Sequence, residues 1–314
     1  MSLAAHPDET PQTPVVSRRQ RTWSAVRHQP AAATGAVVLL LFVLVAILAP
    51  YVAPYGQREK VGDLFASPSG AHPFGLDDGG VDMLTLMMHG ARISLLVGFA
   101  AAAVAMLIGG AVGLLSGYFG GKIDALLSGV TNYMIAIPDI PLILVAAALF
   151  GRSLTNIIVI IGAIYWTYTA RIIRAEVKSV RERVYVQRAR SLGASNARII
   201  LRHVLPQVAP LLVAQTVLFV AYAIFAETSI AFLGLGDPSL ISWGKLIANA
   251  FEANAITAGA WWAIVPPGFA VAFVVLACTM LGRTLEDALN PRLRVGHLSV
   301  HRFRVRRLAA KEQE

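Results

Sequence analysis

The chain has 314 residues, of which 56% are hydrophobic and 14% are charged, and its mean hydropathy is +0.63. Soluble globular domains average about 25% charged residues, so this composition excludes an ordinary soluble domain. The net charge of +9 could suggest nucleic-acid binding. The Lys and Arg residues instead cluster between long apolar runs, as topology determinants of a membrane protein do. We therefore expect a lipid bilayer around the chain and no nucleic-acid partner.

Six apolar runs, each near the ~20 residues needed to cross a bilayer core, predict an all-α, polytopic membrane protein with six transmembrane helices. The runs cover residues 31–52, 93–116, 125–150, 154–170, 208–232 and 262–281. The first run follows a polar arm over residues 1–30, and a cleaved signal peptide is the alternative. The arm is long for a signal peptide, and Pro50, Tyr51 and Pro54 resemble an interfacial helix end. We therefore predict an uncleaved first helix over residues 31–55.

Lys and Arg predict the orientation of these helices. The N-terminal arm holds four, the connection 117–124 one, the segment 171–206 nine, and the chain beyond the sixth run eight. The alternate connections are poor in them: the 56–90 loop and the start of the next run hold three, and the later two hold only Arg152 and Lys245. Cytoplasmic loops carry the excess of Lys and Arg.

Both termini and the 171–206 segment should therefore be cytoplasmic, and the loop over residues 56–90 should be external. The remaining five transmembrane helices fall within residues 91–290, and residues 291–314 form a basic cytoplasmic tail. Trp243, Trp261 and Trp262 are typical of interfacial anchors.

Glycines and ionisable residues inside the runs are candidates for packing or function. Gly109, Gly113 and Gly117 form a repeated small-xxx-small pattern, which predicts close helix packing. Asp139, which lies between two prolines, and Glu227 fall inside predicted spans, where ionisable residues are costly and usually functional. A carboxylate there could attract the ammonium group of a peptide, so both are candidates for a substrate pathway. Glu227 could instead tie helices together or lie near the outer interface.

The segment 171–206 is too polar to span the membrane, yet its pattern predicts helix over residues 174–178 and 185–192 and again over 194–204, with a corner at Gly193 and an end at Leu205-Pro206. Two short helices and a corner would form a rigid platform at the surface. The segment is either a solvated basic loop or a docking site for a cytoplasmic partner.

The stretch Tyr185-Val-Gln-Arg-Ala-Arg-Ser-Leu-Gly-Ala-Ser195, followed by Arg202-His-Val-Leu-Pro206, resembles the EAA loop of bacterial ABC importer permeases. That pattern is Glu-Ala-Ala, three residues, Gly, nine residues, and Ile-x-Leu-Pro. Ala189, Gly193 and the final Leu-Pro pair match in register. The chain departs from the pattern at its first two positions and at its Ile position, which here hold Gln187, Arg188 and His203.

Further segments resemble the C-type permease subunit of dipeptide, oligopeptide and nickel importers, and the resemblance covers roughly residues 30 to 294. They are His72-Pro-Phe-Gly-Leu-Asp77, Gly90-Ala-Arg-Ile-Ser-Leu-Leu-Val-Gly98, Gly117-Tyr-Phe-Gly-Gly121, Glu227-Thr-Ser-Ile-Ala-Phe-Leu-Gly-Leu-Gly236, Ser242-Trp-Gly244 and Leu281-Gly-Arg-Thr-Leu-Glu-Asp-Ala-Leu-Asn-Pro291. Val81 stands where the family usually has Arg.

The resemblance implies a subunit of the bacterial inner membrane that pairs with a second, homologous permease, two ATP-binding subunits and an external substrate-binding protein. ATP-driven closure of the ATPases would rock the transmembrane halves between inward-facing and outward-facing states. The residues that would couple to an ATPase are Gln187, Ala189, Ser191, Leu192, Gly193, Ala194, Leu205 and Pro206. The family's cargo is di- or oligopeptides, or nickel; we favour peptides because the runs contain no histidine, a preferred nickel ligand.

The sequence lacks the signatures of common enzymes. It has no H-E-x-x-H zinc motif, no G-x-S-x-G elbow and no G-x-x-x-x-G-K-[ST] phosphate loop, and its single cysteine is Cys278. We therefore expect no catalytic residue, no metal site and no cofactor in this chain, with ATP and Mg bound by partner subunits. An ATP-independent channel or secondary carrier is an alternative of a different class, but it leaves the platform unexplained. An intramembrane enzyme would need a paired nucleophile and base, which the sequence does not offer.

Overall fold

The computed structural model describes residues 30–289, so the predicted N-terminal arm and basic tail lie outside the described residues. The α-helices are α2 (Pro30–Val52), α3 (Met83–Phe119), α4 (Gly121–Ala136), α5 (Asp139–Phe150), α6 (Leu154–Arg181), α7 (Val184–Ser191), α8 (Asn196–Ile199), α9 (Leu205–Phe232), α10 (Trp243–Glu252) and α11 (Val265–Leu289). A π-helical turn, η1 (Ile200–Val204), precedes α9, and a 3-10 turn, η2 (Trp261–Ala263), precedes α11. Over residues 30–289 there is no strand, and the predicted all-α class is confirmed.

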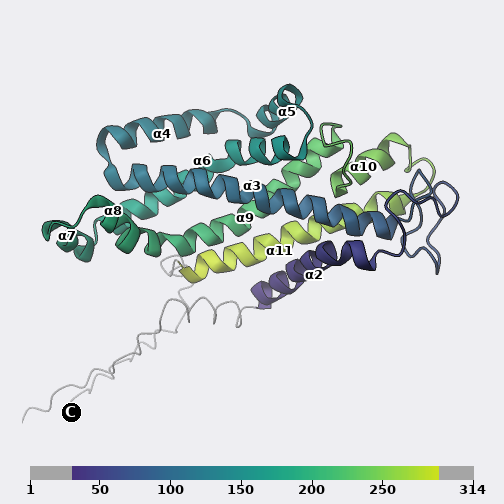
Figure 1. Cartoon of the computed structure of the whole chain (residues 1–314), viewed down its shortest axis with the longest axis horizontal. Coiled ribbons are helices and arrows are strands. Elements are labelled where there is room, and N and C mark those ends of the chain that lie inside the picture. The colour runs from purple at the N-terminus through teal and green to yellow at the C-terminus, as the bar shows by residue number, and fades with distance from the viewer. Residues whose placement is uncertain (1–29, 290–314) are drawn as a thin grey trace, which may run out of the picture.

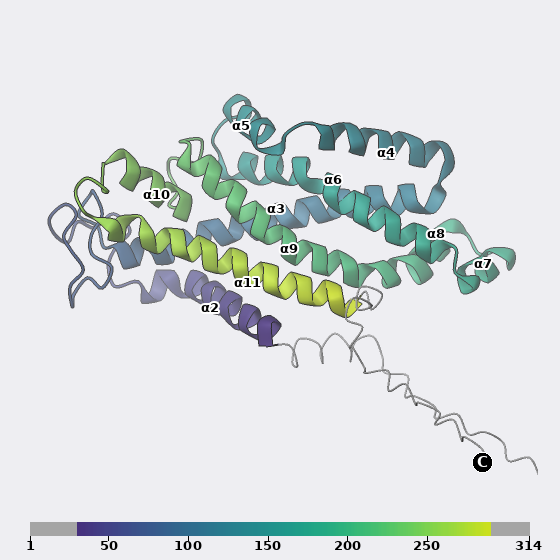
Figure 2. The same ribbon diagram turned by 180° about the vertical axis from the view of Figure 1, so that it is seen from behind.

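The long helices lie side by side along one axis of the molecule (Figures 1 and 2). Helices α7 and α8 project at one end, which we call the α7 end. Helix α10 and the loop over residues 53–82 cover the opposite end, the α10 end. The first described residues of α2 and the last of α11 both point toward the α7 end (Figure 1).

Five single helices are long and apolar enough to cross a membrane: α2, α3, α6, the continuous stretch Asn196–Phe232, and the stretch Trp261–Ala288. Helices α4 and α5 pass the same test only together, and they are bent by 88° at their junction. The prediction of a polytopic helical membrane protein is thus confirmed for the described part of the chain.

The predicted third span over residues 125–150 is not one continuous helix. Ile137 is extended, with ψ at 130°, because the ring of the following Pro138 disfavours the helical conformation in the residue before it. Pro138 and Pro141 also lack the backbone N–H that would continue the helical ladder. Helix α4 therefore ends at Ala136, and a new helix, α5, starts at Asp139.

The predicted platform over residues 171–206 is shorter than expected. Helix α6 continues without a break to Arg181, because Ile173, Val177 and Val180 are fully buried and extend its apolar stripe. The sequence pattern alone does not show that this polar stretch belongs to a spanning helix.

Leu205 and Pro206 do not end a helix, as the sequence predicted, but begin α9. The N–H of Leu205 donates to the carbonyl oxygen of Ile200, five residues earlier, which defines the π-helical turn. Pro206 has no backbone N–H to donate, and it lies directly after the π-helical turn, where the regular helical ladder is already interrupted. Such π-helical turns often occur at functional sites.

Helix α3 starts at Met83, ten residues before the apolar run that predicted it, so the loop predicted over residues 56–90 ends at Asp82. The reason is the N-cap: the buried carboxylate of Asp82 accepts hydrogen bonds from the backbone N–H (2.8 Å) and the hydroxyl (3.0 Å) of Thr85. Trp243 is not an interfacial anchor: it is fully buried, and its indole N–H donates to the carbonyl oxygen of Met87 at 3.1 Å.

Two hydrophobic clusters hold the long helices together. The larger one joins α3, α6, α9 and α11 through the middle of the bundle and the α10 end. The smaller one lies at the α7 end and connects α7, α8 and η1 to α3, α6 and α9. The α7–α8 unit is thus packed onto the spanning helices.

Candidate functional site

The α7–α8 unit turns at Gly193 through a regular helix-ending motif. The N–H of Ala194 donates to the carbonyl oxygen of Ala189 (3.1 Å), and the N–H of Gly193 donates to that of Arg190 (3.0 Å). These two bonds form a Schellman motif, which requires a residue with positive φ after the helix end. Gly193 supplies it with φ at +80°. The positive φ at this corner therefore explains why glycine occupies it.

Packing and polar contacts fix this unit to the spanning helices. Val186 and Ile199 are fully buried in the smaller hydrophobic cluster, where Ala189 and Ala194 pack against them. The hydroxyl of Tyr118 at the end of α3 donates to the side-chain oxygen of Asn196 at 2.9 Å. These contacts link α7 and α8 mechanically to α3 and α6.

Two arginines also contact Tyr118, one at its ring and one at its backbone. The guanidinium of Arg190 lies over it, 5.6 Å from its centroid, and Arg181 donates to the backbone carbonyl of Tyr118 at 3.1 Å. An arginine from α7 and one from α6 therefore hold the end of α3.

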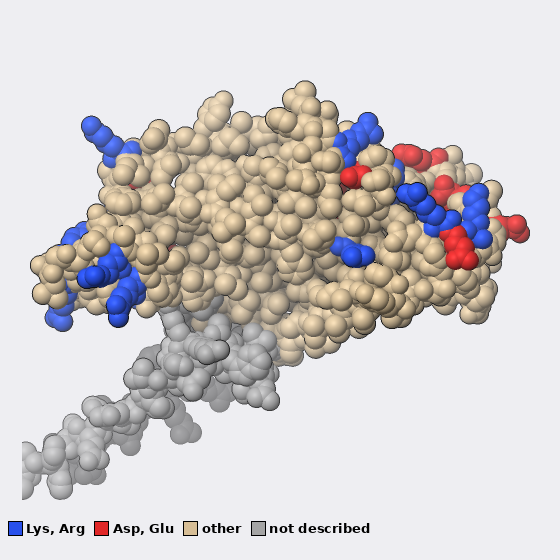
Figure 3. Space-filling view, viewed as in Figure 1, with Lys and Arg blue, Asp and Glu red and all other residues tan. Residues whose placement is uncertain are grey.

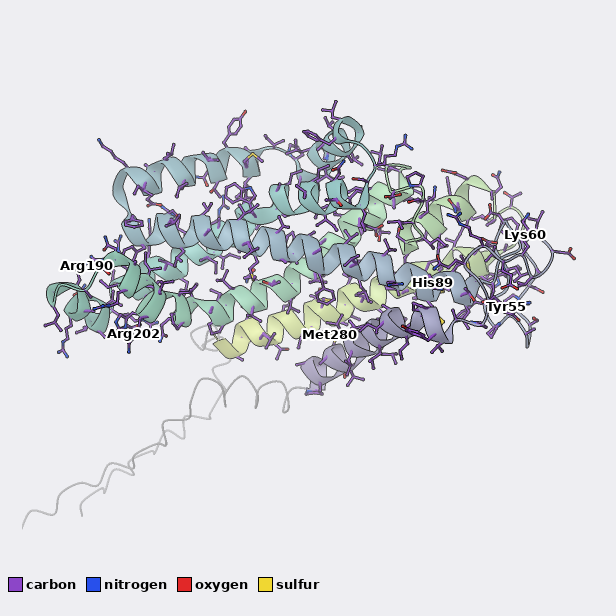
Figure 4. All side chains as sticks on the ribbon, in the orientation of Figure 1. Tyr55, Lys60, His89, Arg190, Arg202 and Met280 are labelled. Carbon is purple, nitrogen blue, oxygen red and sulfur yellow. The ribbon has the colours of Figure 1, made fainter. Side chains whose placement is uncertain are left out.

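The outer surface of the unit combines apolar and basic side chains. Leu192 is 87% exposed and Val184 is 62% exposed, next to several arginines. Arg190 and Arg202 lie at this end (Figure 4), whereas Tyr55, Lys60 and His89 lie at the other. A projecting, partly apolar surface of this kind is suited to a protein partner.

The predicted coupling residues fall into two groups in the structure. Gln187, Ser191, Leu192, Gly193 and Pro206 are exposed, whereas Ala189, Ala194 and Leu205 are partly buried. The exposed ones could meet a partner directly, and the partly buried ones can only position the unit.

On the face shown in Figure 3, charged side chains gather at the two ends of the molecule and leave an almost uncharged band between them. At the α7 end they are mainly Lys and Arg, and at the α10 end both signs are mixed. An uncharged band between two charged ends is the surface expected of a protein in a bilayer.

Gly109, Gly113 and Gly117 all face α6. A Cβ atom added to Gly113 would lie 2.7 Å from the carbonyl oxygen of Ala170, and one added to Gly117 would lie 2.7 Å from the Cβ of Val177. Helices α3 and α6 therefore approach so closely that only glycine fits on this face of α3.

Glu227 lies in a tight polar contact between helices. It is 4% exposed, and the hydroxyl of Ser94 in α3 donates to its carboxylate at 3.2 Å. The same Ser94 oxygen accepts from the backbone N–H of Trp243 at 3.2 Å. Glu227 thereby ties α9 to α3 and α10, the structural alternative that the sequence left open.

Asp139 lies at the start of α5 and lines a cavity of about 380 Å³. The other lining residues come from α6, α9 and α11: Tyr165, Tyr168, Thr169, Ile172, Gln215, Leu218, Phe219, Tyr222 and Glu286. The structure thus separates the two predicted pathway residues: Asp139 lines a sizeable cavity, whereas Glu227 is enclosed.

A second polar cluster, not expected from the sequence, joins α4 to α6. The carboxylate of Asp124 accepts hydrogen bonds from Arg174 (2.8 Å from Nη2) and Lys178 (2.7 Å), and from the hydroxyl of Ser128 (2.9 Å). The two basic residues are four apart in the sequence, so they share one face of α6. That spacing could have indicated a common acidic partner.

Comparison with known families agrees with this architecture. Residues 109–295 match the family described as binding-protein-dependent transport system inner membrane component. The chain belongs to this family. Residues 17–68 match the N-terminal transmembrane domain of oligopeptide transport permease C. This member is thus a multi-pass inner-membrane permease subunit, as the EAA-like stretch had indicated.

Named relatives cover most of the chain. The dipeptide transport system permease protein DppC of Bacillus subtilis (strain 168) is 33% identical over 283 residues, which cover 90% of this chain and 88% of the relative. The oligopeptide transport system permease protein OppC of Escherichia coli (strain K12) is 36% identical over 270 residues, covering 84% and 88%. A putative peptide transport system permease protein of Brucella suis is 38% identical over 264 residues, covering 83% and 88%.

Sequence reasoning missed the aromatic side of the Asp139 cavity. Tyr165 and Tyr168 come from α6, and Tyr222 comes from α9. Tyrosine hydroxyl groups in the middle of apolar runs were a usable signal, because a buried hydroxyl needs a polar neighbour. The pattern of apolar runs alone did not show that α6 and α9 bring these tyrosines into one cavity.

Proposed function

We propose that this chain is one of two homologous permease subunits of an ATP-driven importer that moves di- and oligopeptides into the cytoplasm by alternating access. Two ATP-binding subunits hydrolyse ATP with Mg, and an external binding protein delivers the peptide. The chain itself binds no cofactor and catalyses no reaction.

The observation that carries this proposal is the α7–α8 unit. It presents an exposed apolar tip at Leu192 within a basic surface, and its inner side is packed on α3, α6 and α9. A force applied to such a unit reaches the spanning helices through buried contacts with little room to yield. A channel or secondary carrier would need no such unit.

The orientation follows from the same unit. Its arginines and the basic end of α6 support a cytoplasmic position for the α7 end by the loop-charge rule. The α10 end, where acidic and basic residues mix, then faces outward and meets the binding protein. Both termini lie on the cytoplasmic side in this arrangement.

Peptide cargo is supported by the relatives, whose names describe dipeptide and oligopeptide permeases. Nickel is the alternative cargo within the family. Among residues 30–289 no group of three or more His, Cys, Asp or Glu side chains is placed to hold a metal ion.

The test is uptake of a labelled di- and tripeptide mixture and of ⁶³Ni²⁺ in cells with and without this chain. A Gly193→Val variant tests the coupling unit, because a β-branched residue is strained at a φ of +80°. Gly193→Asn is the matched control, since Asn tolerates positive φ and a Cβ at this position has open space around it.

We expect peptide uptake to be lost in the deletion, reduced at least severalfold by Gly193→Val, and nearly kept by Gly193→Asn. Loss of nickel uptake alone would replace the peptide assignment with nickel. Peptide uptake that persists after ATP depletion, or a purified chain that retains no ATP-binding subunit, would favour the channel or carrier.

A further inference from the structure

The cavity beside Asp139 lies near the middle of the membrane-spanning part. Tyr165 is eleven residues into α6, which at 1.5 Å per residue places it about 16 Å from the start of that helix. Tyr222 is ten residues before the end of α9, or about 15 Å. Both depths are near the midplane of a hydrocarbon core about 30 Å thick.

The polar lining of this cavity is incompatible with contact to lipid tails. Tyr222 is 61% exposed and Tyr168 is 46% exposed in the isolated chain, and Gln215 and Glu286 lie on the same cavity. Exposed tyrosine hydroxyl groups near this depth would lose their hydrogen bonds in hydrocarbon. Polar residues inside spans face the bundle interior or a water-filled cavity. This face therefore lines an aqueous passage, closed on its far side by the second permease.

The lining also has a definite chemistry. Tyr165 and Asp139 line the same cavity. The Tyr165 ring lies 5.1 Å from that of Phe219 and 6.2 Å from that of Tyr168, and the rings of Phe219 and Tyr222 are 6.5 Å apart. A carboxylate beside an aromatic wall is the arrangement that attracts an organic cation, through charge and through the faces of the rings.

We propose that the cavity is a transient binding site for the N-terminal ammonium group of the transported peptide, with Asp139 as its counter-charge and the tyrosines as the wall along which the chain slides. This inference rests on the proposed peptide import. The break between α4 and α5 at Pro138 makes it possible, because it brings Asp139 to a helix start on the cavity wall. Glu286, also in the lining, is a second carboxylate for the ammonium to meet.

The volume suits this role. The cavity measures about 380 Å³ in this subunit, within the roughly 300–1,000 Å³ range of small-molecule sites. The second permease would add the opposite wall. A site that binds only the terminal ammonium and offers aromatic faces elsewhere imposes little side-chain preference, which suits a passage for varied peptides.

The chain contains a single cysteine, so a thiol reporter can be placed in the cavity. Cys278 is buried and is replaced by Ala. Tyr222→Cys is then introduced, with Leu149→Cys as the control, since Leu149 is 77% exposed on α5 and outside the cavity. The complete transporter in proteoliposomes is treated with an anionic methanethiosulfonate, and modification of this chain is followed by mass.

We expect Tyr222→Cys to react much faster than Leu149→Cys, because the charged reagent reaches only water-exposed thiols. Millimolar trialanine should slow the reaction, and N-acetyl-trialanine, which lacks the ammonium, should not. Asp139→Asn should raise the half-protecting trialanine concentration at least about tenfold, as loss of a charge-assisted hydrogen bond predicts. Asp139→Glu should largely restore protection, and Asp287→Asn, an exposed carboxylate outside the cavity, should change nothing.

Equal reaction at the two cysteines would overturn the aqueous passage. Equal protection by both peptides, or protection unchanged by Asp139→Asn, would overturn the ammonium site. The comparison of the two peptides uses unaltered Asp139, so it remains decisive if the Asn variant does not assemble. Each of these results can occur with normal peptide uptake in cells, in which case the site is wrong and the proposed function stands.

Discussion

The close approach of α3 to α6 makes a sharp prediction for Gly113→Ala. The added methyl group would lie 2.7 Å from the carbonyl oxygen of Ala170 and 2.9 Å from the Cβ of Ile173. The first distance is about 0.7 Å shorter than the 3.4 Å at which ordinary contact begins. Both obstacles are backbone or Cβ atoms, so rotating a side chain cannot relieve them, and the helices themselves must separate.

Overpacking of this kind typically costs about 1–3 kcal/mol. The contact between α3 and α6 contains two further glycines that face α6 in the same way. A local separation of the two helices therefore also weakens the contacts at Gly109 and Gly117. We therefore expect Gly113→Ala to lower the free energy of unfolding by an amount toward the upper part of that range.

Gly129→Ala is the matched control. Gly129 lies in α4, and a Cβ there has nothing within 4 Å. The same substitution should be neutral, or stabilising by up to about 1 kcal/mol through helix propensity. The assay is unfolding of the purified chain in mixed micelles by increasing SDS, followed by circular dichroism. If both variants shifted the SDS unfolding midpoint equally, the close packing of α3 against α6 would be refuted.

Two further predictions concern polar contacts. Asp124→Asn should destabilise the chain by about 1–3 kcal/mol and speed proteolysis of α4, because Arg174 and Lys178 lose their shared carboxylate. Unchanged proteolysis would show that these hydrogen bonds do not hold α4 against α6. Hydrogen bonds from the hydroxyl and backbone N–H of Ser239 hold the pKa of Asp237 below its usual 3.8. Because the pKa is lower in the folded state, this stabilisation is complete above about pH 4 and is lost as the pH falls through the folded pKa. Asp237→Asn should therefore lower the SDS unfolding midpoint at pH 7 and have a shrinking effect below pH 4, and a constant difference would rule out the carboxylate's role.

Local sequence signals located most of the spanning helices but not their ends. The run starting at Ile93 was correct as a membrane span, yet the helix begins at Met83, where a buried Asp82 caps it. The sequence could have indicated a capping aspartate at this position, but the polar residues around it resembled a loop. Similarly, α6 extends to Arg181 because one of its faces is buried. Charge on the exposed face masked that stripe.

The candidate sites divide along the same line. Gly193 was predictable because a helix corner needs positive φ, a local property. The roles of Asp139 and Glu227 were not, because both looked alike as carboxylates in apolar runs. Their difference depends on residues from other helices: Glu227 accepts a hydrogen bond from Ser94, 133 residues earlier, whereas Asp139 shares a cavity with tyrosines from α6 and α9.

By itself, the sequence determined that this protein is an all-helical membrane protein, because the length and apolarity of each run and the positions of Lys and Arg are local requirements of the bilayer. It also determined the glycine face of α3, since a repeat of small residues every four positions is visible in the chain. Only the tertiary structure decided that Glu227 is enclosed and that Asp139 opens onto an aromatic cavity. These outcomes depend on which helices pack together, and local periodicity does not encode contacts between different helices.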